Sequence, residues 1–427
     1  MDTTIGRRSF LQSSAAAGLT VLSSKSVFGA PSGNKVNLGI IGCGGRGSHV
    51  AASFMEHTDT RVTAIADLFD DKLREGKKRF NELLRKKGEA ELSDSRLFQG
   101  SDAYRRLLDL KDVDAVLIAT PHFVHPEHLS AAVDAGKHVY LEKPVAVDVN
   151  GCREVILAGK RAEGKVSLAV GFQIRCASPF VKMVDRIHDG DIGDIAMGQT
   201  FYLAGGPNRT ALPGISADER RMRLWALDRA LSGDNILLQG VHVVDICNWV
   251  LKSHPVKAVG AGGRKARDDI GDNWSYFLVQ YEYPGEIPVS FQSQQFNPGY
   301  GDVCERFFGT KGISESHYSG GVFIKGEHEW DSGVARGTQE EISDKDWEAG
   351  AFRSALDDAD QNKQKAFIDS IRSGAFLNEA YSGAESTLSA ILGTIAAYRG
   401  EDVTWDEMMA SGEKIEPLID LTQFDRR

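Results

Sequence analysis

The sequence predicts an α/β protein whose N-terminal half forms a doubly wound parallel sheet. Short runs rich in β-branched residues alternate with amphipathic, helix-like segments between residues 35 and 141. The run 113–119 is apolar at all but one position, which is typical of a central parallel strand covered on both faces. A glycine-rich turn follows the first run directly, as expected where a strand enters a helix.

Length and composition bound the architecture. The chain has 427 residues, more than one ordinary core holds, and domains of roughly 150 residues predict two or three, with two favoured. An apolar fraction of 41% and a charged fraction of 26% are typical of a globular protein and exclude disorder and collagen. The net charge of −10 provides no broad basic face, so nucleic acid is not an expected partner. The five cysteines lack disulfide-scaffold or zinc-ligand spacing and are expected to be mostly buried.

The first residues have the character of a targeting segment. Arg7 and Arg8 precede Phe10 and Leu11, and a weakly hydrophobic Ala/Ser-rich stretch extends to about residue 30. This pattern resembles a twin-arginine export signal, which would make residues 1–33 a signal and linker and the mature protein periplasmic in a bacterium. The alternative is a frayed basic terminus. The cleavage site stays open, and no other stretch reaches the 18 consecutive apolar residues of a membrane-spanning helix.

A dinucleotide site is predicted at the first strand. The strand, residues 35–41, leads into a G-x-G-x-x-G pattern and then into a helix-compatible stretch at 48–55, which is the context this motif requires. In such a loop the first glycine permits a tight turn, the second lets the backbone approach a pyrophosphate, and the third allows close packing of helix and strand. The diphosphate would then lie at the helix N-terminus. The predicted cofactor-binding residues of this loop are Gly42, Gly44, Gly45, Arg46 and Gly47.

The second strand indicates which dinucleotide binds. Residues 61–66 form this strand, and Asp67 follows it, twenty residues beyond Gly47. A carboxylate at this position accepts hydrogen bonds from the adenosine ribose and repels a 2′-phosphate, so NAD is favoured over NADP. The alternative is that Asp67 caps a helix starting at Leu68.

The alternation continues with a helix at 70–87, a strand at 96–99, a helix at 101–110 and the central strand at 113–119. Because a doubly wound sheet binds ligands outside the carboxyl ends of its strands, Thr120, Pro121 and His122 should border the nicotinamide half of the cofactor. His122, His125 and His128 also suggest a metal, but Pro126 argues against one uniform ligand-bearing helix face. We therefore predict no metal site.

Two segments then carry a family resemblance: ATPHFVHPEH at 119–128 and AGKHVYLEKPVA at 135–146. With further matches at 171–173, 240–242 and 309–312, the chain beyond the signal resembles the Gfo/Idh/MocA oxidoreductases. The resemblance implies a Rossmann domain, set at 34–155, followed at 156–427 by an α/β domain with a large, mostly antiparallel sheet. It also implies that His125, Glu142 and Lys143 lie near the cofactor, with Lys143 beside the nicotinamide and a histidine of the second domain, His242, facing it.

Lys143 and His242 are the predicted catalytic pair. A lysine partly removed from water has a lowered pKa and can exchange a proton with a secondary alcohol. The alternative is a surface lysine paired with Glu142, and Pro144 leaves a cis peptide bond open. Residues 235–251 predict a helix capped by Asp234, with Leu238, His242, Asp245 and Trp249 on one stripe and Gln239 beside His242.

One residue departs from the family pattern. Members that are dehydrogenases usually carry an acidic residue four positions before the histidine, where this chain has Leu238. Leucine can neither orient an imidazole nor hold a sugar hydroxyl, so a modified reaction or an altered substrate stays open. Tryptophan and charged groups together suit sugars, and Arg223, Asp228 and Arg229 are further candidates. The predicted substrate-binding residues are Arg175, Trp225, Gln239 and His242.

The sequence is compatible with three functions. The leading one is an NAD-dependent oxidoreductase that moves hydride between nicotinamide and a secondary alcohol of a sugar or polyol. The first alternative is a glycoside hydrolase or lyase that uses tightly bound NAD with no net redox change. The second is a non-catalytic sugar-binding relative, suggested by Leu238. Strands of the second domain, such as residues 274–281, could pair subunits, so a homo-oligomer is also open.

Overall fold

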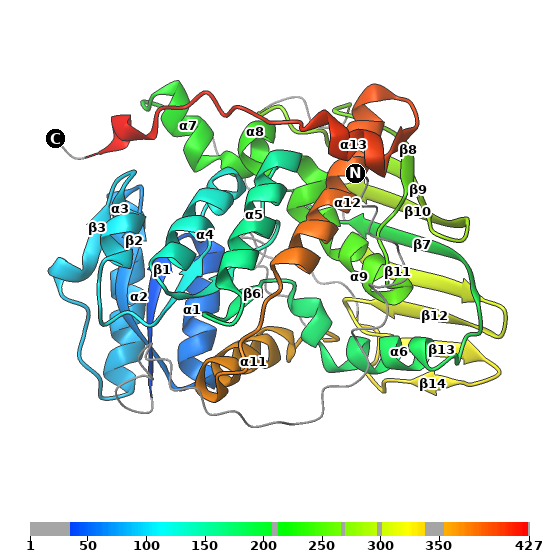
Figure 1. Cartoon of the computed structure of the whole chain (residues 1–427), viewed down its shortest axis with the longest axis horizontal. Coiled ribbons are helices and arrows are strands. Elements are labelled where there is room, and N and C mark those ends of the chain that lie inside the picture. The colour runs from blue at the N-terminus through cyan, green and yellow to red at the C-terminus, as the bar shows by residue number, and fades with distance from the viewer. Residues whose placement is uncertain (1–34, 207–211, 266–269, 297–300, 338–353, 426–427) are drawn as a thin grey trace, which may run out of the picture.

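The computed structural model describes residues 35–206, 212–265, 270–296, 301–337 and 354–425. Two sheets stand side by side in it, with helices between them and on the outer side of the first sheet (Figure 1). The predicted export signal, residues 1–33, lies outside the described residues. In the described part of the chain, no helix combines the length and the hydropathy needed to cross a bilayer.

The first sheet has six strands in the order β3-β2-β1-β4-β5-β6, and all its pairs are parallel. The strand order reverses between β1 and β4, which leaves a crevice outside their carboxyl ends, where doubly wound sheets bind ligands. The strands predicted at 35–41, 61–66, 96–99 and 113–119 are confirmed as the first four strands, and β5 and β6 complete the sheet. Their bounds are β1 Val36–Ile41, β2 Thr60–Asp67, β3 Leu97–Gln99, β4 Ala115–Ile118, β5 His138–Leu141 and β6 Leu168–Val170.

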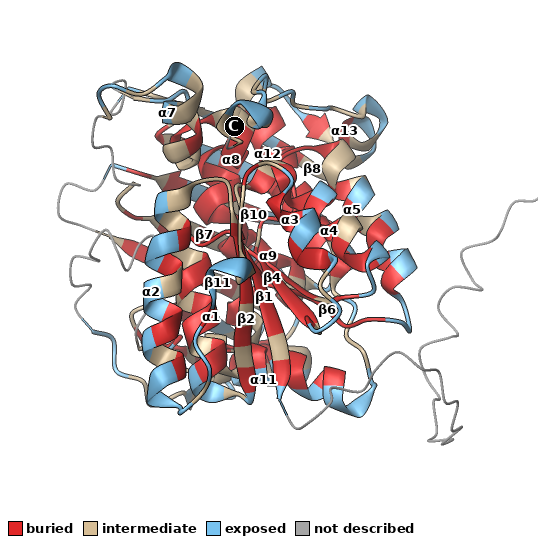
Figure 2. Cartoon of the chain, turned by 90° about the vertical axis from the view of Figure 1, so that its left-hand side faces the viewer, coloured by how far each residue is buried: buried red, intermediate tan, exposed pale blue. Residues whose placement is uncertain are grey.

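Helices cover both faces of this sheet, and Figure 2 shows the strands as its buried centre. The predicted domain boundary at residue 155 is wrong, because it falls inside α5 and the chain then returns to the sheet as β6. The first domain therefore extends to Val170. Its helices are α1 Gly45–His57, α2 Asp70–Lys86, α3 Ala103–Leu108, α4 His125–Asp134 and α5 Val149–Ala162, with short 3₁₀ turns at Asp94–Arg96 and His122–Val124.

The second sheet has nine strands in the order β14-β13-β12-β11-β7-β10-β9-β8-β15. Every neighbouring pair is antiparallel except β7 and β10, so the expected mostly antiparallel sheet is confirmed. The strands are β7 Ile195–Leu203, β8 Lys257–Gly263, β9 Tyr276–Tyr283, β10 Ile287–Gln294, β11 Asp302–Gly309, β12 Gly312–His317, β13 Phe323–Gly326, β14 Trp330–Asp331 and β15 Val403–Thr404.

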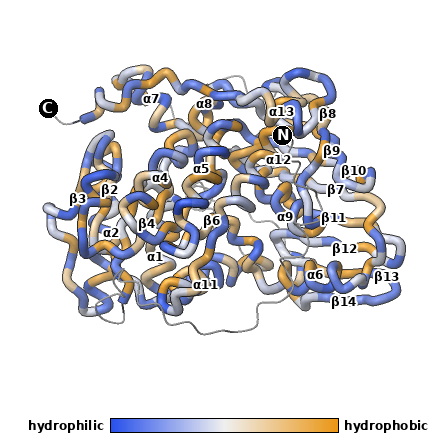
Figure 3. Tube along the Cα trace, in the orientation of Figure 1, coloured by the Kyte–Doolittle hydropathy of each residue, from blue (hydrophilic) through white to orange (hydrophobic). Residues whose placement is uncertain are grey.

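The helices of the second domain gather on the face of this sheet that looks toward the first domain (Figure 1). The central one, α12, is buried over most of its length and packs against both β8 and α5. Hydrophobic and hydrophilic segments alternate along most helices (Figure 3), as expected for helices with one buried face. The bounds are α6 Ser178–His188, α7 Ala217–Arg223, α8 Arg229–Ser232, α9 Val241–Leu251, α11 Ala359–Ser373, α12 Ala380–Arg399 and α13 Trp405–Ser411, with 3₁₀ turns at Gln173–Cys176, Trp225–Leu227 and Leu421–Phe424.

The predicted helix over 235–251 is confirmed, but its first part is π-helical. It begins as a π-helix, η5, at Ile236–Gly240 and continues as α9 from Val241. Asp234 is not its N-cap: with φ of 78° it lies in the left-handed region, and its carboxylate accepts hydrogen bonds from the amides of Asn235 and Trp274 and from the hydroxyl of Tyr398. The turns of a π-helix such as η5 are wider than those of an α-helix, and they are often found at functional sites.

Candidate active site

The glycine loop between β1 and α1 leaves room for an anion. Gly42 has φ of 96°, and a Cβ there would lie 2.6 Å from the carbonyl oxygen of Ala119. A Cβ on Gly47 would lie 2.1 Å from the carbonyl oxygen of Gly42, whereas one on Gly44 would meet nothing within 4 Å. Helix α1 starts at Gly45 and no side chain caps its N-terminus. The free amides and the open space at Gly44 fit a pyrophosphate.

A cavity of about 440 Å³ extends from this loop and is lined by both domains, a size within the range of small-molecule sites. Asp67 lies in its wall, and its carboxylate accepts hydrogen bonds from the amides of Cys43 (2.7 Å) and Phe69 (2.9 Å). Because α2 begins at Asp70 without a side-chain cap, the alternative role of Asp67 as a helix cap is wrong. Its carboxylate instead ties the end of β2 to the glycine loop, where a ribose would lie.

The carboxyl end of β4 forms the other end of the cavity. Thr120 and Pro121 line it, as does Trp225 from the second domain. The Nδ1 of His122 lies 2.8 Å from the carbonyl oxygen of Ser232, and its ring packs edge-on against Trp225 at 4.6 Å between centroids. Burial, with smaller contributions from His125 and Lys143, lowers the pKa of His122 well below its usual value. The ring is therefore neutral, with its Nδ1–H donating to Ser232.

His125 has a different role from the predicted one. Its Nδ1 lies 2.8 Å from the carbonyl oxygen of Pro144, and its Nε2 lies 2.8 Å from that of Thr120. With both nitrogens facing backbone carbonyls, the ring joins the loop after β4 to the loop after β5 and does not line the cavity. His128 stacks on Tyr104 and contacts the hydroxyl of Thr120, so the three histidines do not converge on one point.

Lys143 is buried at the carboxyl end of β5, and its Nζ donates a 2.9 Å hydrogen bond to the carbonyl oxygen of Leu238 in the π-helix. The peptide bond to Pro144 is cis, one of the two forms the sequence left open. Burial lowers the pKa of Lys143 to about 8, an effect that Glu142 opposes and Arg46 adds to. A lysine with this pKa exchanges protons near neutral pH. The surface-lysine alternative is therefore wrong.

His242 faces the same region from α9. Its Nδ1 is buried with no hydrogen-bond partner among the described residues, and its ring lies edge-on to Phe172. Burial first, and then the charge of Lys143, lowers the pKa of His242 well below its usual value. Leu238, one turn earlier, contributes a backbone carbonyl to Lys143 but no group that could orient the imidazole. Gln239 bonds instead to the carbonyl of Gly205 and to the amide group of Gln295.

Arg46 lines the cofactor cavity and Glu142 does not, and the two side chains are bonded to each other. The Arg46 guanidinium bonds to Glu142 at 2.9 Å and to both carboxylate oxygens of Asp360 from α11 at 2.8 and 2.9 Å. The Glu142 carboxylate fills the space beside Gly171, where a Cβ would lie within 2.9 Å of it. Only the backbone and stem of Arg46 remain available to a cofactor. This three-residue network was not predicted, since Asp360 is remote in sequence and carries no motif.

Removing the arginine of this network should destabilise the protein strongly. We expect Arg46→Met to lower the free energy of unfolding by about 3–5 kcal/mol, because Glu142 and Asp360 would remain as mostly buried, unpaired carboxylates. The control Arg85→Met, which breaks an exposed pair with Glu91, should cost no more than about 1 kcal/mol. Urea denaturation measures both, and equal losses would show that the network is not a buried one.

Arg175 forms an ion pair on another surface of α9. Its guanidinium contacts the Asp245 carboxylate through Nε and Nη2 at 2.8–3.1 Å, and Ser386 donates a further hydrogen bond of 2.7 Å to the same carboxylate. Arg175 does not line the described cavity. His242 and Asp245 both lie in α9, after the π-helix, yet they make separate contacts: Asp245 pairs with Arg175, and His242 lies beside Phe172.

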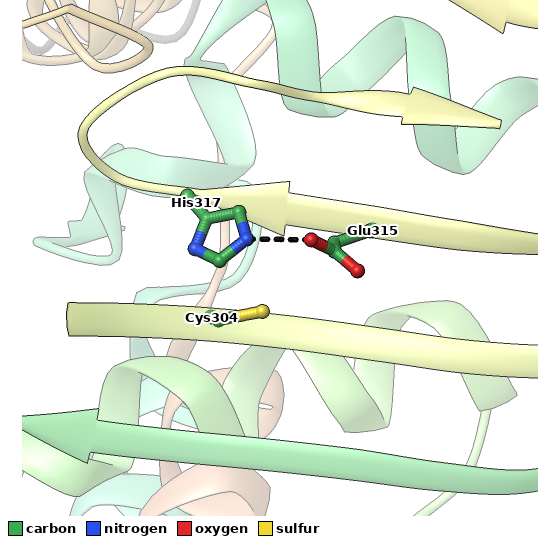
Figure 4. A group of neighbouring side chains, drawn as sticks. All are labelled: Cys304, Glu315 and His317. Atoms are coloured by element: carbon green, nitrogen blue, oxygen red, sulfur yellow. Dashed lines mark hydrogen bonds and ion pairs between the residues drawn. The ribbon is translucent and has the colours of Figure 1, made fainter. Parts of the chain in front are cut away.

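A second cluster of chemically active side chains lies on the outer face of the second sheet. Cys304, Glu315 and His317 approach one another there (Figure 4), with single ligand atoms within 4.8 Å of one another. The nitrogens of His317 already contact Asp302 (2.9 Å) and Glu315 (2.7 Å), and Arg306 and Arg336 pair with these two carboxylates. Burial raises the pKa of the Cys304 thiol. The cluster is thus a chain of hydrogen-bonded and ion-paired side chains beside a protonated thiol.

Comparison with known proteins agrees with this geometry. A model described as an oxidoreductase family with an NAD-binding Rossmann fold matches residues 36–172, and a GFO/IDH/MocA C-terminal domain matches residues 180–315. The fold and the site define an NAD-binding oxidoreductase with a separate second domain. Inositol 2-dehydrogenase 2 of Saccharopolyspora erythraea is 30% identical over 345 residues, which cover 79% of this chain and 86% of that protein. The chain belongs to the Gfo/Idh/MocA family.

Other relatives match less of the chain or only its fold. The 1,5-anhydro-D-fructose reductase of Ensifer adhaerens is 30% identical over 174 residues, 40% of this chain and about half (48%) of that protein. The crystal structure of myo-inositol 2-dehydrogenase from Lactobacillus plantarum aligns with a TM-score of 0.66 at 19% identity, over 87% of this chain and 99% of that one. At this identity the alignment shows the shared fold.

Proposed function

We propose that the protein transfers hydride between NAD and a secondary alcohol of a sugar or polyol. The observation that carries this proposal is the buried ammonium of Lys143, fixed by the Leu238 carbonyl at the end of β5, next to the end of β4, where Thr120 lines the dinucleotide cavity. Burial lowers the pKa of Lys143 to about 8, and the fold does not require a lysine at this position. Ionisable groups with strongly shifted pKa values in a cleft are candidate catalytic groups. Two relatives named for acting on inositol and on an anhydrosugar support the substrate class.

Different residues would bind the cofactor and transfer the proton. Gly44 and the α1 amides would hold the pyrophosphate, Asp67 the ribose, and Thr120 and Pro121 the nicotinamide end. When bound there, NAD would supply the acceptor for the hydride, the hydrogen and electron pair lost by the carbinol carbon. Neutral Lys143 takes the hydroxyl proton, so the alcohol becomes a carbonyl and atoms and electrons balance. His242, neutral through burial and close enough to Lys143 to feel its charge, is a second hydrogen-bonding group beside it.

A two-armed assay tests the reaction. Purified protein with NAD should produce a stoichiometric rise in absorbance at 340 nm with one or more members of a panel of inositols and aldoses. In the second arm, aryl glycosides should release no phenol. Phenol release without accumulated NADH would replace this proposal with redox-neutral hydrolysis by bound NAD. Tight NAD binding with no turnover in either arm would replace it with a binding role.

We also propose that residues 1–33 direct the folded protein through the twin-arginine pathway to the periplasm. The support is the Arg7-Arg8 pair followed by Phe10, Leu11 and an Ala/Ser-rich stretch. In a bacterial host, the full chain should fractionate with the periplasm, and Arg7→Lys with Arg8→Lys should keep it in the cytoplasm. Periplasmic recovery of this double variant would contradict the proposal.

Self-association through the open face of the second sheet is a further proposal. Apolar side chains on β7, β8, β9 and β12 are exposed, and each has at least one buried neighbour along its strand. These exposed residues are Met197, Val259, Leu278 and Ile313. We expect light scattering to give at least a dimeric mass, and Leu278→Lys to reduce it. A monomeric mass for the unmodified protein would contradict this.

A further inference from the structure

The last part of the described chain crosses back over the first domain. After α13 the tail segment, residues 413–425, runs past α8 and α7 and ends beside β3 (Figure 1). The amide of Ile415 donates to the Asp148 carboxylate at 2.7 Å, and the carbonyl of Pro417 accepts from Arg221 at 3.0 Å. The tail is thus attached along its path before it reaches the nucleotide site.

Its end docks on residues that line the cofactor cavity. The Asp425 carboxylate accepts hydrogen bonds from the amide (2.6 Å) and the hydroxyl (3.0 Å) of Ser101, which lies in the cavity wall. Gly100 has φ of 114°, and a Cβ there would lie 2.6 Å from the same carboxylate. Phe424 packs edge-on against Phe69 at 5.5 Å between centroids, and Leu421 is itself part of the cavity wall.

A second contact closes the same side from α7. Both terminal nitrogens of the Arg223 guanidinium bond to the Asp71 carboxylate of α2 at 3.0 and 3.1 Å. The guanidinium lies 4.1 Å from the Phe69 ring centroid, and its Nε bonds to Glu219. Arg223, offered by the sequence as a substrate contact, instead bridges the two domains over the end of β2. Phe69 is therefore held between α7 and the tail.

Asp67, Phe69, Gly100 and Ser101 follow β2 and β3, so this end of the cavity belongs to the adenosine half of the dinucleotide. We propose that the tail segment and Arg223 form a clasp over the adenosine site that retains NAD between turnovers. The inference rests on the proposed NAD function. Release of the adenosine half requires the bonds of Asp425 or of Arg223 to break, so the clasp slows dissociation more than it changes the chemistry at Lys143.

Retention has a chemical consequence. A nicotinamide that stays bound after accepting hydride has to return it within the same active site, either to a second carbonyl substrate or to the oxidised sugar itself. The clasp therefore predicts turnover without free NADH as the leaving product whenever a carbonyl acceptor is present. In the 340 nm assay, which contains no carbonyl acceptor, the same retention makes NADH release slow, so the first equivalent of NADH per active site should form faster than the later ones.

Release of NAD from the full-length protein tests the clasp. Protein loaded with radiolabelled NAD is diluted into excess unlabelled NAD, and bound label is followed by rapid gel filtration. We expect Phe424→Ala with Asp425→Ala to raise the dissociation rate at least about tenfold. The matched control is Lys414→Ala with Glu416→Ala, an exposed pair in the same tail, which should leave the rate unchanged.

Two results overturn the proposal, and they differ from each other. Equal dissociation rates for the Phe424/Asp425 double variant and the unmodified protein would remove the clasp and leave the NAD function standing. Failure of the unmodified protein to bind any label would remove both. Thermal unfolding of each variant without NAD, expected to stay within a few degrees of the parent, shows that the tail changes act on release and not on folding.

Discussion

Replacing Lys143 with alanine should reduce turnover by about 10²–10⁴-fold, the range for loss of a positioned proton acceptor, while NAD binding persists. The side chain is anchored by one hydrogen bond to the Leu238 carbonyl and does not line the dinucleotide cavity. Steady-state kinetics with the best polyol from the panel, together with NAD titration of the same sample, measure both quantities. Loss of NAD binding in step with turnover would give Lys143 a structural role.

A second buried lysine serves as the matched control. Lys137 donates hydrogen bonds to the carbonyls of Leu110 and Val113, at the end of the first sheet opposite to Lys143. Burial lowers its pKa also, but it has no contact with the site. Lys137→Ala should therefore lower stability and leave kcat unchanged. A comparable loss of kcat in both variants would mean that burial of a lysine, not its position, explains the effect.

The pH dependence follows from the same residue. The pKa of Lys143 is lowered to about 8 because the ammonium is buried. Only the neutral amine accepts a proton, so kcat/KM for alcohol oxidation should rise with pH and level off above about 8. Carbonyl reduction needs the ammonium and should fall over the same interval. An oxidation profile that is flat from pH 6 to 9 would contradict proton transfer by Lys143.

Gly44→Ala should weaken NAD binding by about tenfold or more while the protein still folds. A Cβ at this position meets no protein atom within 4 Å and would project into the space where the backbone should approach the pyrophosphate. A tenfold loss corresponds to about 1.4 kcal/mol of binding free energy. Isothermal titration with NAD measures the affinity, and unchanged affinity would place the dinucleotide elsewhere.

Gly47→Ala in the same loop is the informative contrast. Its Cβ would lie 2.1 Å from the Gly42 carbonyl oxygen, a contact that backbone atoms cannot relieve without moving the loop. We expect this variant to lose stability as well as NAD binding. Thermal unfolding separates the two glycines: only Gly47→Ala should lower Tm by several degrees. If Gly44→Ala lowered Tm and Gly47→Ala lowered only NAD binding, the ligand would lie against Gly47.

Much of the first domain could be predicted because its signals are local. Strand-length apolar runs, the glycine pattern and Asp67 at the end of β2 each depend on a few neighbouring residues, and the structure places them as expected. The boundary at 155 failed because β6 is only three residues long and too short to stand out as a run. The antiparallel second sheet came from the family resemblance, since long-range pairing leaves little local signal.

The site was less predictable wherever a contact joins distant residues. No spacing rule links Arg46 to Asp360, or Asp425 to Ser101. The π-helix was missed because Ile236–Gly240 has ordinary helical composition, and the wider turn is fixed by tertiary contacts. Leu238 appeared as a missing acid in the sequence; in the structure its carbonyl, a group every residue carries, holds Lys143.

The most direct test is a crystal structure of the full chain grown with NAD. The account predicts the pyrophosphate over Gly44 at the start of α1, the ribose against the Asp67 carboxylate, and the nicotinamide ring within contact distance of the Lys143 ammonium. A dinucleotide lying outside the glycine loop, or one whose nicotinamide ring is separated from Lys143 by the second domain, would contradict the account.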